Sequence, residues 1–257
     1  MNGSTYAGMG ILAGCNAGKE RKLSLTEILR TFFPMECPLC GGVPFDDSPG
    51  MFCADCLLSL EFTQPPYCPG CGGRLSGILE LCPDCLAESV RPWKEAFALF
   101  QMSGLAQEVI HRYKYRKRPE LARALGQLAA GRIAPLAGKI DFIVPTPLHW
   151  TRFLQRGFNQ AALFSEGVSK RSGLPIRNVL RRIKRTKQQA RLKRDERLSN
   201  LKGAFSVTDS TIVQKRAILL TDDVMTTGST LSAAAQTLLE AGASDVYVLV
   251  IARRQRI

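Results

Sequence analysis

The sequence lacks any hydrophobic stretch long enough to cross a bilayer. Its longest uninterrupted apolar run is Val246–Ala252, whereas a transmembrane helix needs about 20 apolar residues. Acidic residues are also few, since 22 Asp and Glu stand against 35 Lys and Arg. The first lack excludes a membrane-spanning protein. The second gives a net charge of +13, which implies an anionic partner such as phosphates, nucleic acid or a lipid surface.

Two common nucleotide-binding motifs are missing as well. There is no Gly-Lys-Ser/Thr, so the chain is not a P-loop protein, and no G-x-G-x-x-G, so the dinucleotide fingerprint is absent. A secretory signal is not indicated either, because no Lys or Arg precedes the short apolar stretch near residue 12. We therefore expect a cytoplasmic protein with reduced thiols.

Cysteines are the first feature that is plentiful. Eight of the 9 cysteines form four C-x-x-C pairs within residues 37–85, and the segment repeats itself. The run Cys37-Pro38-Leu39-Cys40-Gly41-Gly42 matches Cys68-Pro69-Gly70-Cys71-Gly72-Gly73. A duplicated unit is expected to be self-sufficient. We therefore predict two sites of four ligands each: Cys37, Cys40, Cys53 and Cys56 in the first, and Cys68, Cys71, Cys82 and Cys85 in the second.

The spacing within each pair favours zinc. Two intervening residues let both thiolates reach one tetrahedral ion at about 2.3 Å. The glycines after each first pair permit the positive φ that turns backbone N–H groups toward the sulfurs. Four thiolates leave no position for water, so two structural Zn²⁺ sites are predicted. Iron–sulfur clusters, redox pairs and disulfides are the alternatives, and the missing signal peptide disfavours the last.

From residue 91 onward, strand and helix patterns alternate. Strands are expected near residues 96–100, 140–144, 176–183, 204–207, 217–221 and 246–251, and helices at 105–115, 121–133, 159–172 and 230–241. This alternation predicts an α/β fold with a parallel sheet covered on both faces. The predicted domains are an unstructured extension (1–22), a leading helix (Leu23–Phe33) with a double zinc ribbon (23–90), and the α/β domain (91–257).

The sharpest motif spans residues 217–230. An apolar strand is followed by Asp222 and Asp223, and a Thr/Gly/Ser loop then opens an Ala-rich helix. Hydroxyls and backbone N–H groups at a helix N-terminus form a phosphate cradle. The two carboxylates can accept hydrogen bonds from vicinal hydroxyls, so the motif fits a sugar with a 5′-phosphate. A phosphoacceptor receiver domain also has paired acids at a strand end, but too little chain follows here.

Residues 217–230 resemble the phosphoribosyl-pyrophosphate (PRPP) motif of type I phosphoribosyltransferases. With the cysteine region and Arg156-Gly157-Phe158-Asn159-Gln160-Ala161, the chain from about residue 23 is similar to the ComF/GntX family. The resemblance implies a double zinc ribbon followed by a type I phosphoribosyltransferase-like domain.

Roles for individual residues follow from this resemblance. Asp222 and Asp223 would bind the ribose hydroxyls. The 5′-phosphate would be held by Thr226, Thr227, Gly228, Ser229 and Thr230. A pyrophosphate loop would include Pro145, Thr146 and Pro147, and a basic mobile loop would contribute Lys187, Arg191, Lys193 and Arg194. Mg²⁺ would bridge the pyrophosphate and the ribose hydroxyls. No catalytic residue is implied, and neither His111 nor His149 is given a role.

Two functions remain open. In the first, the protein binds PRPP and Mg²⁺ and serves natural competence and DNA uptake, handling single-stranded DNA with a competence helicase and DNA-loading proteins. In the second, it is an active phosphoribosyltransferase of nucleotide metabolism with an unidentified acceptor and no DNA role. Residues 152–202 carry fifteen Lys and Arg against three acids, interleaved with Phe153, Phe158 and Phe164. This pattern suits a single strand, although we favour core packing for the aromatics.

Overall fold

In the computed structural model the chain divides into two units, Met1–Met35 and Glu36–Ile257. The residues described are 36–44, 52–75, 78–87, 91–115, 119–148, 154, 157–184 and 203–254. The predicted extension (1–22) and leading helix (Leu23–Phe33) lie outside them. Within these ranges, no helix combines the length and apolar character that crossing a membrane requires.

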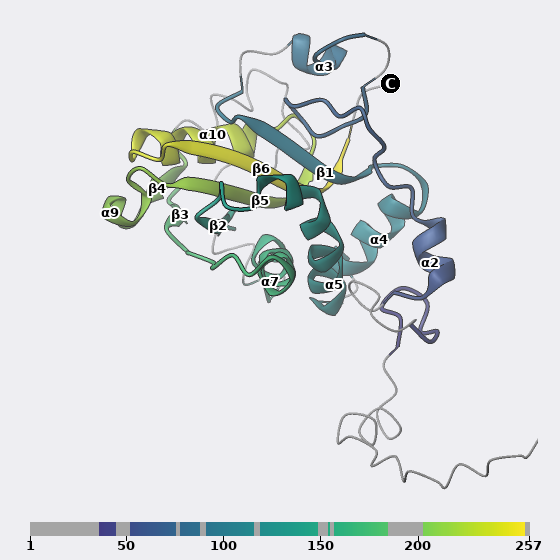
Figure 1. Cartoon of the computed structure of the whole chain (residues 1–257). Helices are drawn as coiled ribbons and strands as arrows, with labels where there is room; N and C mark the ends of the chain where they lie inside the picture. Colours follow the sequence, from purple (N-terminus) through teal and green to yellow (C-terminus); the bar gives the residue numbers. More distant parts are fainter. Residues whose placement is uncertain are drawn as a thin grey trace, which may run out of the picture. The chain divides into compact units, whose positions relative to one another are not determined.

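Four parallel strands form the central sheet, in the order β1-β6-β5-β2 (Figure 1). The register pairs Ala217 with Asp245 and Phe142 with Ile218. Strand β6 is buried along nearly its whole length, which explains its unbroken apolar run, because strands covered on both faces need not alternate. The predicted α/β class is confirmed. The strands are β1 (Glu95–Gln101), β2 (Phe142–Pro145), β5 (Ala217–Met225) and β6 (Asp245–Arg253).

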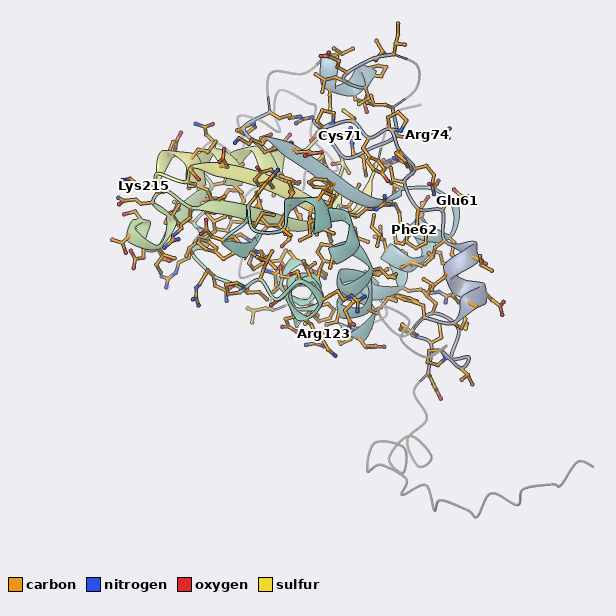
Figure 2. The ribbon with its side chains drawn as sticks, in the orientation of Figure 1. Glu61, Phe62, Cys71, Arg74, Arg123 and Lys215 are labelled. Carbon is orange, nitrogen blue, oxygen red and sulfur yellow. The ribbon has the colours of Figure 1, made fainter. Side chains whose placement is uncertain are left out.

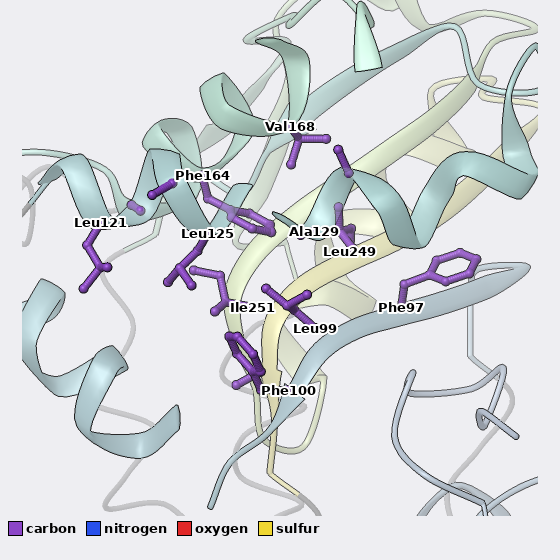
Figure 3. Packing of buried hydrophobic residues seen from close by; sticks show 14 of the residues in the cluster. Phe97, Leu99, Phe100, Leu121, Leu125, Ala129, Phe164, Val168, Leu249 and Ile251 are labelled. Carbon is purple, nitrogen blue, oxygen red and sulfur yellow. The ribbon is translucent and has the colours of Figure 1, made fainter. Parts of the chain in front are cut away.

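Alternate side chains of the strands enter two cores on opposite faces of the sheet. Leu249 and Ile251 belong to one core and Val248 and Val250 to the other. Helices α4, α5 and α7 cover the first core, which Figure 3 shows around Phe164, and α10 covers the second. These helices are α4 (Gly104–Tyr115), α5 (Pro119–Ala129), α7 (Gln160–Ser172) and α10 (Ser229–Glu240); a short α9 (Ser210–Val213) precedes β5.

Helices α5 and α7 approach each other through two glycines. A Cβ at Gly126 would overlap the carbonyl oxygen of Phe164, and one at Gly167 would overlap that of Arg123. The Arg123 guanidinium also pairs with Glu166 of α7 at 2.5 Å. This contact fixes the position of α7, whose N-terminus lies beside the end of β2.

The structure corrects three predicted elements. Residues 176–183 do not form one strand of the parallel sheet: Ile176 makes an isolated parallel bridge to Ile143 of β2, whereas β3 (Leu180–Arg182) pairs antiparallel with β4 (Phe205–Val207) in a separate two-stranded sheet. The arginines of β3 fit a solvated sheet rather than one covered on both faces. Helix α5 stops at residue 129 and continues as a 3₁₀ helix, η2 (Ala130–Leu136), which contains Pro135. Strand β5 runs four residues beyond its predicted end.

Candidate functional site

The structure brings eight cysteines into two groups of four, as the repeat predicted. Within each group the four sulfur atoms lie within 4.8 Å of one another. We call residues 37–56 the first ribbon and residues 68–85 the second ribbon. Each contains a short helix that begins directly after a cysteine: α2 (Ala54–Ser59) after Cys53 and α3 (Pro83–Leu86) after Cys82.

The sulfur positions fit zinc. A tetrahedral ion with bonds of about 2.3 Å separates its sulfurs by roughly 3.8 Å. Cys40 Sγ and Cys53 Sγ lie 3.5 Å apart, and Cys71 Sγ and Cys82 Sγ lie 3.6 Å apart. The backbone N–H of Gly42 donates to Cys40 Sγ at 3.3 Å. The two four-cysteine groups are therefore structural zinc sites.

Each group holds one cysteine that ionises readily. Hydrogen bonds from the thiols of Cys71 and Cys85 lower the pKa of Cys68 to about 3. Burial opposes ionisation of Cys37, but backbone N–H groups, that of Cys53 foremost, lower its pKa to about 7. The thiolate is the form that binds a metal. Burial raises the pKa of Cys56, and the hydrogen bond with Cys68 raises the pKa of Cys85, so in each group protonated neighbours stabilise one thiolate.

The sequence suggested that Asp222 and Asp223 follow the strand. The structure instead places both residues within β5. The strand continues because its backbone pairs with β6 as far as Met225, which lies opposite Arg253. Both carboxylates are half-buried. Asp222 Oδ1 accepts from the N–H of Asp223 at 2.8 Å, and Asp223 Oδ1 accepts from the N–H of Val224 at 2.6 Å. These bonds orient the acids at the carboxyl end of the strand.

The five residues predicted to hold a phosphate lie in the loop from β5 to α10 (226–228) and in the first turn of α10 (Ser229 and Thr230). Gly228 precedes the helix as its N-cap with φ of 78°, in the left-handed region that favours glycine. Thr227 Oγ1 and Ser229 Oγ lie 2.8 Å apart. The first N–H groups of a helix have no intrahelical partner, so backbone donors and hydroxyls converge at this helix N-terminus.

The predicted pyrophosphate loop lies beside this strand. Pro145, at the end of β2, pairs with Thr221, and the N–H of Thr146 donates to the carbonyl of Thr221 at 2.9 Å. Asn159, the N-cap of α7, donates from Nδ2 to the carbonyl of Thr146 at 3.1 Å. The Thr146 hydroxyl is buried and has no hydrogen-bond partner among the residues the structure describes. Two of the predicted segments thus meet at one edge of the sheet.

Sequence analysis missed two arginines that contact the β5–α10 loop. Arg91 donates to the carbonyl of Thr227 at 2.9 Å, and Arg253 donates to the carbonyls of Met225 and Thr226. Burial lowers the pKa of Arg91. Arg91 is remote from the motif in the sequence, and Arg253 ends an apolar strand. No local pattern therefore identified either arginine.

Only some of the other residues considered in the sequence analysis lie in the part of the chain that the structure describes. Lys187, Arg191, Lys193 and Arg194, together with His149 and Phe153, lie outside the described residues. Phe164 is fully buried in the core, and Phe158 is half-buried against the same core, so the core interpretation of these two aromatics is confirmed. His111 is on the surface of α4.

Comparison with known sequences connects both halves of the chain to named proteins. A family model described as "Double zinc ribbon domain" matches residues 28–86. Competence protein F of Haemophilus influenzae is 31% identical over 88% of this chain and 100% of its own length. DNA utilization protein YhgH of Escherichia coli K12 is 33% identical over 74% of this chain and 86% of its own. Competence protein ComFC of Bacillus subtilis is 29% identical over 74% and 78%.

Among solved structures, adenine phosphoribosyltransferase of Leishmania tarentolae aligns with 65% of this chain and 93% of its own length, at 12% identity and a TM-score of 0.38. Glutamine PRPP amidotransferase of B. subtilis aligns with 55% of this chain at 19% identity and a TM-score of 0.39. The chain spans 30% of that amidotransferase's length.

Proposed function

This chain belongs to the competence protein F family, and from that premise we propose that it serves DNA uptake or utilisation and binds PRPP. The relatives' names support the first part. The single observation that carries the second is the passage from β5 through Thr226–Ser229 into α10.

The arrangement of this passage suits a phosphorylated ribose. The N-terminus of α10 offers a phosphate a positive dipole end and backbone N–H groups that have no carbonyl partner within the helix. Two carboxylates, Asp222 and Asp223, lie a few residues before it at the carboxyl end of β5. Carboxylates accept two hydrogen bonds per oxygen, so Asp222 and Asp223 have the chemistry to hold vicinal hydroxyls.

Mg²⁺ is part of the same proposal. Mg²⁺ is held by oxygen ligands and keeps several waters when it binds a phosphate ester, and this donor set fits the two carboxylates and the ligand's own oxygens. When bound, it would neutralise charge on the pyrophosphate. The buried hydroxyl of Thr146 supports placing pyrophosphate at the end of β2, because buried polar groups are normally paired.

Replacing Asp222 and Asp223 together with Asn tests PRPP binding. Asn keeps the size of the side chain and its Oδ1 acceptor but removes the charge. PRPP affinity in Mg²⁺ should fall by about 2–4 kcal/mol, because each charge-assisted hydrogen bond contributes roughly 1.5–3 kcal/mol and the losses overlap. Isothermal titration calorimetry measures this, and the melting temperature should stay near that of the wild type.

Asp245→Asn is the matched control. Asp245 begins β6, at the amino end of the parallel strands and so at the opposite end from Asp222 and Asp223, and it pairs with Lys94 at 2.8 Å. Its replacement should leave PRPP affinity unchanged. Full affinity in the Asp222/Asp223 double variant would refute the site. Release of pyrophosphate on adding a candidate acceptor would favour the transferase over a purely binding role.

The DNA part of the proposal rests on the relatives' names and on charge. Residues 152–202 hold fifteen of the 35 basic residues, and phosphate contacts dominate affinity for DNA strands. Fluorescence anisotropy with a single-stranded oligonucleotide should give an affinity that falls by about 0.7 log units per log unit of salt for each phosphate contacted. Absence of binding at low salt would leave the basic residues to the pyrophosphate alone.

A further inference from the structure

Two buried guanidiniums lie behind the β5–α10 loop. Arg253, the last residue of β6, has a side chain only 2% exposed, and its Nη1 donates to the carbonyls of Met225, at 3.3 Å, and Thr226. Arg91 Nη1 donates to the carbonyl of Thr227 at 2.9 Å. The carbonyls of three consecutive residues, Met225 to Thr227, therefore each accept from a guanidinium, and that of Met225 also accepts from the backbone N–H of Arg254 at 2.9 Å.

This arrangement decides where the loop's N–H groups point. The peptide unit is planar and trans, so its N–H and C=O point in opposite directions. Carbonyls held toward the arginines leave the N–H groups of the following residues facing away from them. That is the orientation in which a loop at a helix N-terminus binds a phosphate.

Both arginines are in turn fixed by the second ribbon. Arg253 Nη2 pairs at 3.0 Å with Oδ2 of Asp84, which lies between the last two cysteines of that ribbon. The Arg91 guanidinium lies 5.4 Å from the ring centroid of Trp93. Trp93 Nε1 donates to the carbonyl of Gly70, between the first two cysteines, at 3.1 Å. Two chains of contacts, which we call the two arms, therefore connect the second ribbon to the loop. The first arm is Asp84–Arg253 and the second is Gly70–Trp93–Arg91; each begins at a residue between two cysteines of a C-x-x-C pair and ends at a carbonyl of the loop.

The first ribbon offers a natural control. Asp55 is the counterpart of Asp84 in the repeat, since the runs read Cys53-Ala54-Asp55-Cys56 and Cys82-Pro83-Asp84-Cys85. Asp55 is exposed, whereas Asp84 has a side chain 20% exposed and paired with a buried arginine. The same residue at the same repeat position is therefore in contact with the loop-binding arginines in one ribbon only.

We infer that the second four-cysteine group positions the β5–α10 loop, acting through Asp84–Arg253 and Trp93–Arg91 as positioning residues. The inference rests on the proposed function and deepens it: the metal-binding module and the phosphate site are one coupled structure. Loss of the second metal site lowers affinity for PRPP, and loss of the first does not.

Asp84→Asn and Asp55→Asn, made in the full-length zinc-loaded chain, test this inference. Hydrogen–deuterium exchange reports on amides 226–230, with the amides of α5 as an internal reference, and calorimetry measures the dissociation constant of PRPP in Mg²⁺. Asp84→Asn should speed exchange in the loop about tenfold, leave α5 unchanged and weaken PRPP binding about tenfold. Asp55→Asn should change none of these, and zinc content should stay at two per chain in both.

The outcomes separate this inference from the proposed function. Failure of the wild type to bind PRPP would reject the proposed function, while the exchange rates would still decide whether the ribbon holds the loop. Equal loop exchange in the two variants would overturn the inference. If Asp84→Asn loses zinc or does not fold, Arg91→Met tests the second arm at a residue outside the cysteine groups. Exchange at 226–230 unchanged in that variant overturns the inference equally.

Discussion

The two ribbons have closely similar sequences and different surroundings. In the first, Cys40 is exposed and Cys56 half-buried, whereas all four cysteines of the second are buried. The C-x-x-C-G-G run is the same in both apart from one residue, Leu39 against Gly70. Gly70 has space for no side chain, because a Cβ there would approach Cys85 Sγ to 3.0 Å.

The ribbons also attach to the α/β domain by different means. The first is contacted by a side chain of α4, Arg112, which donates to the carbonyl of Leu39 at 3.0 Å. The second is joined to the central sheet through its backbone: the N–H of Ala96 in β1 donates to the carbonyl of Pro69 at 2.8 Å, and Cys71 lies beside that strand (Figure 2). The two copies therefore keep the same type of metal site but have different neighbours. A substitution that disrupts the second ribbon also disturbs its backbone hydrogen bond to the central sheet.

Replacing equivalent cysteines with Ser should give the largest difference between the ribbons. Cys71 is 0% exposed, so in Cys71→Ser no water can replace the lost thiolate, and breaking this buried ionic contact to the metal costs about 3–5 kcal/mol. In Cys40→Ser, water can reach the exposed position and complete the metal's coordination. The Cys71 variant should melt roughly 6–20 °C below the Cys40 variant, since 1 kcal/mol shifts the melting temperature of a chain of this size by about 2–4 °C.

Calorimetry and zinc analysis of the purified variants measure these effects. The wild type should hold two zincs per chain, and Cys71→Ser one. Equal melting temperatures for the two variants would remove the proposed difference between the ribbons.

Alanine at the two ribbon glycines should separate strain from steric overlap. Gly41 and Gly72 both have positive φ, 77° and 68°, so Ala costs each about 1–2 kcal/mol of backbone strain. Only at Gly72 would the new Cβ also meet backbone atoms, the N of Ala98 and the C of Phe97, both at 2.5 Å. Overpacking adds about 1–3 kcal/mol, so Gly72→Ala should lose about 3 kcal/mol and Gly41→Ala about 1 kcal/mol.

Urea unfolding of both variants gives these values directly. A Gly41→Ala variant as unstable as Gly72→Ala would show that the first ribbon is packed as tightly as the second.

We expect the smallest difference in stability from replacing the side chains that hydrogen-bond to a ribbon carbonyl, Trp93 at the second ribbon and Arg112 at the first. Trp93→Phe leaves the carbonyl of Gly70 unpaired in a buried position, which costs about 1–3 kcal/mol. Arg112→Met removes the bond to Leu39 from a side chain that is 37% exposed, where water can replace it, and should cost about 0.5–1 kcal/mol. Thermal unfolding of the two variants, compared at equal zinc content, checks the order. The reverse order would place the tighter attachment at the first ribbon.

Elements with strong local patterns were predicted well. The strand at residues 246–251 and the helix at 159–172 agree with β6 and α7 within one or two residues at each end, because a long apolar run and a helix cap are local signals. The strand at 176–183 was placed correctly only at its start, where Ile176 bridges to Ile143 of β2. Its later residues pair with β4 in a separate sheet, because strand pairing is set by distant residues. The extent of β5 was also misjudged: its pairing with β6 continues through Asp222, whose charge reads as the end of a strand.

The sequence by itself determined which cysteines share a site and where the loop between β5 and α10 lies, because a C-x-x-C pair or a strand–loop–helix turn is built from residues close together along the chain. Only the tertiary structure decided that Asp84 meets Arg253, a residue 169 positions away. The reason is physical: a hydrogen bond depends on distances of about 3 Å in space, and an arginine at the end of an apolar strand carries no local signal of the partner that packing will bring to it.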